Sequence, residues 1–359
     1  MLQVDNVNIR CEKKIITPKS LKETISASED MLEFIQRSRD TITNILKGVD
    51  PRLIVIVGPC SVHNPKEALD YAENLANLNK EVSDTLFLVM RVYFEKPRTS
   101  IGWKGLVNDP FLNGSFCIEE GLTMARQLMH DITQLGLPIA TEALDPIVPQ
   151  YLHDYVSWTA IGARTTGSQT HREISSGLSS PVGFKNSIDG DLSTAVHAMK
   201  SASSSHSFLG VNLDGEVATV ETTGNDAVHI VLRGGHVPNH DSISVAECEE
   251  TLRAADFTPS IIIDCSHGNS QKNHKRQPLV AENVVSQIME GNTSIKGLML
   301  ESNIKEGNQP VSSLNKLTNG LSVTDECIDW RTTETLLQEC HKKLKYIIEN
   351  RGVLSLESA

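Results

Sequence analysis

The sequence has no long apolar run, no paired-cysteine motif and no excess of basic residues. No apolar run reaches about 18 residues, the length that a membrane-spanning helix needs, so we expect no membrane partner. The N-terminus lacks a basic region followed by an apolar stretch, which argues against a secretory signal. The seven cysteines contain no C-x-x-C pair, and an odd number of scattered thiols favours a cytoplasmic location. The net charge of −12 argues against nucleic acid, whose binding requires basic patches.

In place of these features the chain has eight short apolar runs, each followed by a residue able to do chemistry. In the most distinct of them, residues 261–263 are all isoleucine and lead to His267. The other seven runs cover residues 55–57, 86–90, 139–141, 159–162, 182–184, 229–232 and 298–300. Eight buried parallel strands with functional residues at their carboxyl ends predict an α/β fold. We expect a (β/α)8 TIM barrel whose active site lies at that end.

The predicted barrel is preceded by an extension and carries one insertion. Residues 1–50 lie outside the strand pattern, and a capping box at residues 26–29 opens an amphipathic helix that ends at Gly48. This extension is either a plug for the bottom of the barrel or a regulatory and oligomerisation arm. Within the catalytic barrel of residues 51–359, an Asp-Gly turn predicts a β-hairpin inserted at about 207–224. Further helices are expected over residues 118–135 and from 332 to about 350.

Basic residues recur at the ends of the predicted strands of this acidic chain. They are Arg91, Arg164, Lys185 and Arg233. Ordinary exposed residues have no reason to recur at strand ends, so this ring fits a substrate that carries both phosphate and carboxylate. The loop after the second strand could hold a second anionic substrate through Lys96, Arg98, Thr99 and Ser100.

Potential metal ligands end or follow neighbouring strands. They are Cys60, His267, Glu301 and Asp325. Such a mixed donor set suits one divalent ion, Mn²⁺, Fe²⁺, Co²⁺ or Zn²⁺, better than Mg²⁺. The spacing also permits a core cysteine, a capped histidine and two carboxylates at the rim. A carbonyl-polarising metal beside two anion sites suggests carbon–carbon bond formation between two phosphorylated molecules.

Six motifs of the chain match a known family. They are GPCS (58–61), MRVYFEKPRT (90–99), GARTT (162–166), PVGFKN (181–186), LRGG (232–235) and DCSHGN (264–269). On these motifs the chain resembles type I 3-deoxy-D-arabino-heptulosonate-7-phosphate (DAHP) synthase, the entry enzyme of the shikimate pathway. One departure is Gly167, where members of that family carry glutamate.

The resemblance implies condensation of phosphoenolpyruvate with erythrose 4-phosphate. It assigns the metal to Cys60, His267, Glu301 and Asp325, and phosphoenolpyruvate to Arg91, Arg164, Lys185 and Arg233. It places Lys96 near both substrates, and Arg98 and Thr99 on erythrose 4-phosphate. Glu142 would order the water that adds at C2, and Lys96 and His267 are further catalytic candidates.

The resemblance also implies feedback inhibition by an aromatic amino acid, with tyrosine favoured over phenylalanine, in a homodimer or homotetramer. The effector cavity would comprise the N-terminal arm, Pro149, Gln150, Leu178, Ser179, Phe208 and Val220. Alternatively, Pro149 and Gln150 only start a helix and Phe208 only packs. Other functions are a different phosphoenolpyruvate–sugar synthase, a metal-dependent aldolase, or an idle amino-acid-binding regulator. An idle regulator should have lost a site residue, and none is missing.

Overall fold

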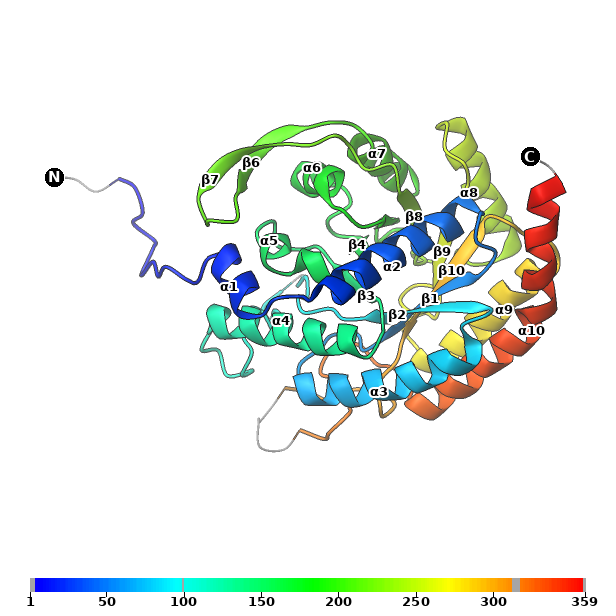
Figure 1. The fold of residues 1–359 in the computed structure, drawn as a ribbon, viewed down its shortest axis with the longest axis horizontal. Coiled ribbons are helices and arrows are strands. Elements are labelled where there is room, and N and C mark those ends of the chain that lie inside the picture. The colour runs from blue at the N-terminus through cyan, green and yellow to red at the C-terminus, as the bar shows by residue number, and fades with distance from the viewer. Residues whose placement is uncertain (1–3, 99, 312–316, 358–359) are drawn as a thin grey trace.

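The chain forms the closed barrel that its strand pattern predicts, in a computed structural model that describes residues 4–98, 100–311 and 317–357. Eight parallel strands close in the order β1-β10-β9-β8-β5-β4-β3-β2, with helices around them (Figure 1). They are β1 (Leu53–Gly58), β2 (Leu86–Arg91), β3 (Ile139–Glu142), β4 (Trp158–Ile161), β5 (Val182–Lys185), β8 (Val228–Leu232), β9 (Ile261–Asp264) and β10 (Ile295–Glu301). Every predicted run overlaps one of these strands, and the predicted fold class is confirmed.

The strands are apolar throughout because both of their faces are buried. Successive strand residues point to opposite faces. In β1, Val55 and Val57 therefore pack outwards against the helices, whereas Ile54 and Ile56 pack inside the barrel. A parallel strand that is covered on both faces has a continuous hydrophobic sequence. The strands could therefore be recognised although apolar and polar residues do not alternate in them.

Helices follow the strands and cover the outside of the barrel. They are α3 (Pro65–Val82), α4 (Ile118–Gln134), α5 (Val148–Leu152), η1 (His153–Tyr155), α6 (Gln169–Gly177), α7 (Ser193–Ala202), α8 (Ser242–Ala254), η2 (His274–Arg276), α9 (Gln277–Met289) and α10 (Trp330–Glu357). The last helix begins two residues before the predicted position because the Asp329 side chain accepts a hydrogen bond from the Thr332 N–H (2.8 Å), as a helix N-cap does. Across the described parts of the chain, no helix has the length and apolarity that crossing a membrane requires.

The extension contains α1 (Pro18–Thr24) and α2 (Glu29–Lys47). The predicted capping box was wrong in detail, because the N-cap of α2 is Ser28, whose Oγ accepts from a first-turn N–H. Glu29 is thus the first helical residue and does not stand three positions after the cap. The predicted end is confirmed, since Gly48 adopts the left-handed conformation (φ 79°) that glycine tolerates best.

Helix α2 closes the barrel at the end where the strands begin. Ile42 and Ile45 are fully buried and belong to the core inside the barrel, together with Ile54 and Trp158. The helix thus packs as a plug. It leaves the opposite end, where the strands finish, free for a site.

The predicted insertion is an antiparallel hairpin of β6 (Ser207–Val211) and β7 (Val217–Glu221). It arches over α6 and α7 in Figure 1, and the segment before α1 projects from the body at the left. Helix α1 contacts the hairpin tip, where the Lys19 N–H donates to the Leu213 carbonyl (2.8 Å). The extension therefore meets the barrel bottom through α2 and the hairpin through α1.

Candidate active site

A cavity of about 410 Å³ opens at the carboxyl ends of the barrel strands. The predicted site residues that line it are Arg91, Lys96, Arg98, Glu142, Arg164, Lys185, Arg233, His267, Glu301 and Asp325. Cys60 is fully buried and contacts two of them, Lys96 and Asp325. Thr99 lies outside the described residues. Side chains from seven barrel strands and their following loops therefore converge where the strand pattern predicts a site.

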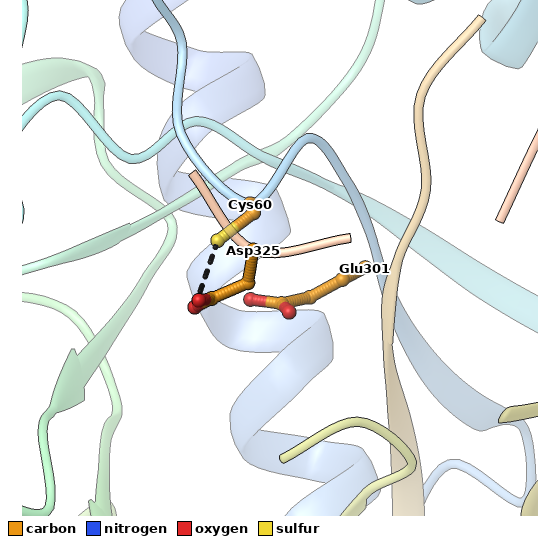
Figure 2. A group of neighbouring side chains, drawn as sticks. All are labelled: Cys60, Glu301 and Asp325. Carbon is orange, nitrogen blue, oxygen red and sulfur yellow. Dashed lines mark hydrogen bonds between the residues drawn. The ribbon is translucent and has the colours of Figure 1, made fainter. Parts of the chain in front are cut away.

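Three of the four predicted metal ligands lie together. One ligand atom each from Cys60, Glu301 and Asp325 falls within 4.8 Å of the others. Figure 2 shows the Cys60 sulfur and the Glu301 carboxylate directed towards Asp325, whose Oδ2 lies 3.4 Å from Cys60 Sγ. Cys60 follows β1 and Glu301 ends β10, and these strands pair directly, with Gly58 opposite Glu301. Closure of the barrel thus unites residues that are 241 positions apart in the sequence (301 − 60).

His267 stands beside this group and is not within it. Its Nε2 lies 3.8 Å from Glu301 Oε1, and its Nδ1 lies 2.8 Å from Asp264 Oδ2. Its backbone is left-handed (φ 52°), which is uncommon for a residue other than glycine and occurs often at functional sites. Because Asp264 engages Nδ1, it is Nε2 that faces the ligand group, in the manner of a metal-binding histidine oriented by a carboxylate.

The group carries buried negative charge. Burial alone would raise the pKa of Glu301, but His267, Arg91 and Lys96 outweigh it and lower that pKa to about 2. Burial, reinforced by Glu301, raises the pKa of the Cys60 thiol to about 11. Without a cation among these donors Cys60 is therefore a thiol, and it donates a hydrogen bond to Asp325.

This donor set fits a divalent ion of intermediate softness. A sulfur with two carboxylate oxygens suits Mn²⁺, Fe²⁺, Co²⁺ or Zn²⁺ better than it suits Mg²⁺, which prefers ligands that are all oxygen. Binding of such an ion would release the proton of Cys60, because the thiolate is the ligand form. Lys96 Nζ already approaches the group, 3.0 Å from Cys60 Sγ and 3.8 Å from Asp325 Oδ2.

Arg91 supports the floor of the cavity. It is 1% exposed, and its NH2 donates to Glu301 Oε1 (2.8 Å) and to the Cys60 carbonyl (3.2 Å). Its guanidinium also stacks 3.6 Å from the centre of the Tyr93 ring. Since a buried charge needs partners, these contacts fix Arg91 against Cys60 and Glu301 and limit how far its guanidinium can turn towards a substrate.

The other three strand-end cations form the second half of the site. Lys185 is 5% exposed and donates to Asp264 Oδ2 (2.7 Å). Burial lowers the pKa of Arg233, and the positive charge of Arg164 contributes in the same direction. Two like charges that face one cavity repel each other, and a bound anion relieves the repulsion. This half of the cavity is thus suited to a phosphate or a carboxylate.

Glu142 faces the cavity from the end of β3. Its Oε1 is buried and has no hydrogen-bond partner among the described residues. The carboxylate lies directly against Gly162, where an added Cβ would overlap Oε1 and the Glu142 side chain would have to shift. An unsatisfied carboxylate oxygen beside a substrate cavity is suited to hold a water molecule. Gly167, by contrast, is exposed and does not line the cavity.

The predicted effector residues lie on neighbouring elements away from the cavity. Phe208 and Val220 pair across the hairpin, and Leu178 and Ser179 follow α6. Pro149 and Gln150 are in α5, where Pro149 also lines a small cavity of about 20 Å³. The extension links these elements, because the Tyr151 hydroxyl of α5 donates to the Ile16 carbonyl (2.8 Å) and α1 contacts the hairpin tip.

Four residues of the site region carry no role predicted from the sequence. They are Asp264, Ser266, His274 and Glu326. Asp264 is 0% exposed and contacts both Lys185 and His267, and the Ser266 hydroxyl donates to Glu301 Oε2 (2.8 Å). One signal pointed to Asp264, since a carboxylate at the end of a buried isoleucine run needs a partner. His274 and Glu326 gave no such signal.

The chain is similar to proteins of one family. The sequence profile of the DAHP synthetase I family matches residues 21–338. The Tyr-sensitive phospho-2-dehydro-3-deoxyheptonate aldolase of Salmonella typhimurium is 54% identical over 342 residues, covering 95% of this chain and 96% of that protein. The Phe-sensitive enzyme of Escherichia coli is 48% identical and covers 96% of this chain and 98% of its own length.

A solved structure gives the same result. The phospho-2-dehydro-3-deoxyheptonate aldolase of Francisella tularensis superposes with a TM-score of 0.92 at 45% sequence identity. The match covers 94% of this chain and 99% of the Francisella chain. It therefore extends beyond the barrel strands to nearly every element described above.

Proposed function

The chain belongs to the DAHP synthetase I family, and on that basis we propose that it condenses phosphoenolpyruvate with erythrose 4-phosphate. The products are DAHP and phosphate, in the first step of the shikimate pathway. One observation carries the proposal: a sulfur-and-carboxylate donor group and a cluster of strand-end cations share one cavity. An aldolase without phosphorylated substrates would not need two sets of anion-binding side chains.

Phosphoenolpyruvate would occupy the cationic half of the cavity. Arg164, Lys185 and Arg233 offer charged donors to its phosphate and carboxylate, with Arg91 beneath them. Erythrose 4-phosphate would enter between Lys96 and Arg98, whose Nε already donates to the Trp103 carbonyl (2.7 Å) and so holds the rim in shape. The family pattern adds Thr99 to this second phosphate site.

We propose that Cys60, His267, Glu301 and Asp325 hold one divalent ion, Mn²⁺, Fe²⁺, Co²⁺ or Zn²⁺. When bound, such an ion supplies Lewis acidity towards the aldehyde carbonyl. Ser266 and Arg91 donate to the two oxygens of Glu301, and Asp264 holds Nδ1 of His267. These contacts orient the donors before any ligand arrives, as in other preorganised metal sites.

The two steps of the reaction would use different residues of the cavity, carbon–carbon bond formation first and water addition second. C3 of phosphoenolpyruvate attacks the aldehyde carbon, the new carbon–carbon bond forms, and the aldehyde oxygen takes a proton. Burial opposes the charge of Lys96, but Cys60 in its thiolate form, Glu301 and Asp325 outweigh it and raise the pKa of Lys96. Lys96 is thus an ammonium that can deliver this proton, and His267 is the second candidate for it.

Water then adds at C2 of the former phosphoenolpyruvate. Glu142 orients this water through its free Oε1 and accepts a proton from it. The C2–O bond to phosphate breaks, C2 becomes the ketone of the product, and phosphate leaves beside Lys185 and Arg233. The overall balance is one water consumed and one phosphate released for each bond formed.

The test is phosphate release from phosphoenolpyruvate, with and without erythrose 4-phosphate, in Mn²⁺ and then in EDTA. Release that needs both the sugar phosphate and the metal, with DAHP formed in equal amount, supports the proposal. Release from phosphoenolpyruvate alone would indicate a phosphatase. No release under any condition would favour the idle amino-acid-binding regulator.

We also propose that an aromatic amino acid inhibits the enzyme, with tyrosine favoured over phenylalanine. The higher identity to the Tyr-sensitive relative supports this choice. The effector would bind near Pro149, Gln150, Leu178, Ser179, Phe208 and Val220, whose elements meet the extension. The active assay repeated with each aromatic amino acid identifies the effector.

The assembly that we propose is a homodimer or homotetramer, in which residues 1–50 serve as plug and regulatory arm and residues 51–359 as catalytic barrel. The part of the extension before α1 projects from the body in Figure 1, which suits an arm that meets another subunit. The cytoplasmic location remains our proposal, supported by seven cysteines that are all free thiols.

A further inference from the structure

Asp325 is the least restrained member of the metal group. Its side chain is 66% exposed, whereas Cys60 and Glu301 are both 0% exposed. Cys60 and Glu301 are at or next to the ends of barrel strands, but Asp325 lies in an irregular loop over residues 321–329. Core packing therefore fixes two ligands, and other contacts must set the position of the third.

Backbone pairing holds part of this loop. Gly307 and Cys327 exchange two N–H···O bonds (2.8 and 3.2 Å), and the Ile328 N–H donates to the Glu301 carbonyl (3.1 Å). These bonds lie on the C-terminal side of Asp325. They fix the path of the chain, but none of them reaches the side chains of residues 325 and 326.

Side chains of other elements contact both neighbours of Asp325. Thr324 is contacted by Ser61 and Asn308 (2.7 and 2.9 Å), and Glu326 is contacted by His274. His274 opens η2, after β9, and its Nδ1 lies 2.8 Å from Glu326 Oε2. The imidazole is only 9% exposed, and its Nε2 lies 3.7 Å from Glu306 Oε2, beyond hydrogen-bond distance. His274 thus lies between the carboxylates of Glu306 and Glu326, which belong to the two segments that pair at residues 307 and 327.

We propose that His274 is a positioning residue for the ligand Asp325, acting through Glu326. Glu326 is the next residue along the chain, so a restraint that turns its carboxylate to His274 also limits the rotation of the peptide that carries Asp325. With Glu326 directed at His274, the Asp325 carboxylate lies against Cys60. The inference rests on the metal site proposed above and adds a contact at its outer edge.

The opposing interpretation is that this contact is an ordinary surface ion pair. Glu326 is 45% exposed, and exposed pairs contribute little to stability. On that interpretation the backbone bonds at residues 307 and 327 and the side-chain contacts at Thr324 position Asp325 without His274. Removal of His274 would then leave metal binding unchanged, so the two interpretations predict different results.

The experiment measures Mn²⁺ dissociation constants by the EPR signal of the free ion, for the full chain and five variants. His274→Phe and Glu326→Ala should each weaken Mn²⁺ binding by about 10-fold, the lower end of the usual effect of an outer contact on a metal site. The double variant should bind no more weakly than either single variant, because both act through one contact. Lys275→Gln is the matched control, since Lys275 lies in the same turn and contacts Glu306 instead (3.6 Å).

Thermal unfolding in EDTA checks that each variant is folded before metal is added. If His274→Phe fails this check, Glu326→Ala still tests the proposal, because it changes a partly exposed side chain. If folded His274→Phe and Glu326→Ala bind Mn²⁺ with the wild-type dissociation constant, the inference is overturned.

Cys60→Ala separates that outcome from failure of the metal site itself. If Cys60→Ala loses Mn²⁺ while His274→Phe keeps it, only the positioning role is wrong. If Cys60→Ala also binds Mn²⁺ normally, the metal site is wrong. In Co²⁺-loaded protein, the sulfur-to-metal absorption band should persist in His274→Phe, because the Cys60 bond remains.

Discussion

Asp264→Asn is the substitution that most directly tests how the two halves of the site are joined. Asp264 is 0% exposed, and one of its oxygens, Oδ2, lies 2.7 Å from Lys185 Nζ and 2.8 Å from His267 Nδ1. Its other oxygen accepts from the Ser266 N–H (3.0 Å). Asparagine has nearly the same shape, so the substitution removes the charge and creates no cavity.

The magnitude follows from burial. Lys185 is 5% exposed, so Asp264→Asn leaves an ammonium in the protein without its carboxylate. Removal of one partner of a buried ion pair typically costs about 3–5 kcal/mol. We therefore expect the free energy of unfolding to fall by about 3 kcal/mol, and Mn²⁺ affinity to fall by roughly 10- to 100-fold because His267 loses its orienting contact.

The assay has two parts, urea denaturation of the metal-free protein and Mn²⁺ titration of the folded protein. Asp226→Asn is the control, because its ion pair with Lys47 (3.6 Å) lies at the surface, where the Asp226 side chain is 89% exposed. The control should leave both measurements unchanged. An Asp264→Asn protein with the wild-type urea midpoint and the wild-type Mn²⁺ constant would refute the reasoning that this carboxylate joins the two halves.

Three further predictions follow from other parts of the structure. Gly162→Ala should lower phosphate release at least 10-fold while sparing Mn²⁺ binding, because the new Cβ would displace the Glu142 carboxylate (2.2 Å); unchanged turnover would remove Glu142 from water orientation. Burial lowers the pKa of His153 to about 3 and that of His229 to about 4. Both pKa values lie below the value of about 6.5 for histidine in the unfolded chain, so the unfolded chain binds more protons than the folded protein. The free energy of unfolding should therefore fall as pH falls from about 6.5 towards 4, by about 1.4 kcal/mol per pH unit for each residue. His229→Gln should make this dependence, measured by urea midpoints, less steep, and an unchanged slope would count against it. Removal of residues 1–15 should weaken inhibition by tyrosine more than it weakens catalysis, and equal inhibition of the shortened chain would exclude the arm from regulation.

Much of the fold could be predicted because it depends on burial that each strand shows locally. Residues 261–263 are all isoleucine, and a strand covered by helices outside and by other strands inside requires such a run. The hairpin was equally visible, since Asp214 and Gly215 form a turn that few other residue pairs favour. The start of α2 was misjudged because Ser26 and Ser28 are both acceptable caps in sequence, and only the path of the chain selects Ser28.

The sequence by itself determined which residues would meet at the mouth of the barrel. Parallel strands all end at the same face, so any residue that directly follows a strand points to one site, and this identified Cys60, Lys185 and Glu301 without coordinates. The motifs around these residues also sufficed to indicate the family, which the profile match over residues 21–338 confirms.

Only the tertiary structure decided which of these side chains touch. Lys185 and Asp264 are 79 positions apart, and their strands, β5 and β9, are separated by β8. Whether such side chains meet depends on barrel closure, strand register and rotamers, none of which a linear spacing encodes. For the same reason the sequence could not reveal that His267 stands beside the ligand group, or that His274 reaches the loop of Asp325. Local burial determines a strand, but a site depends on contacts across the closed barrel.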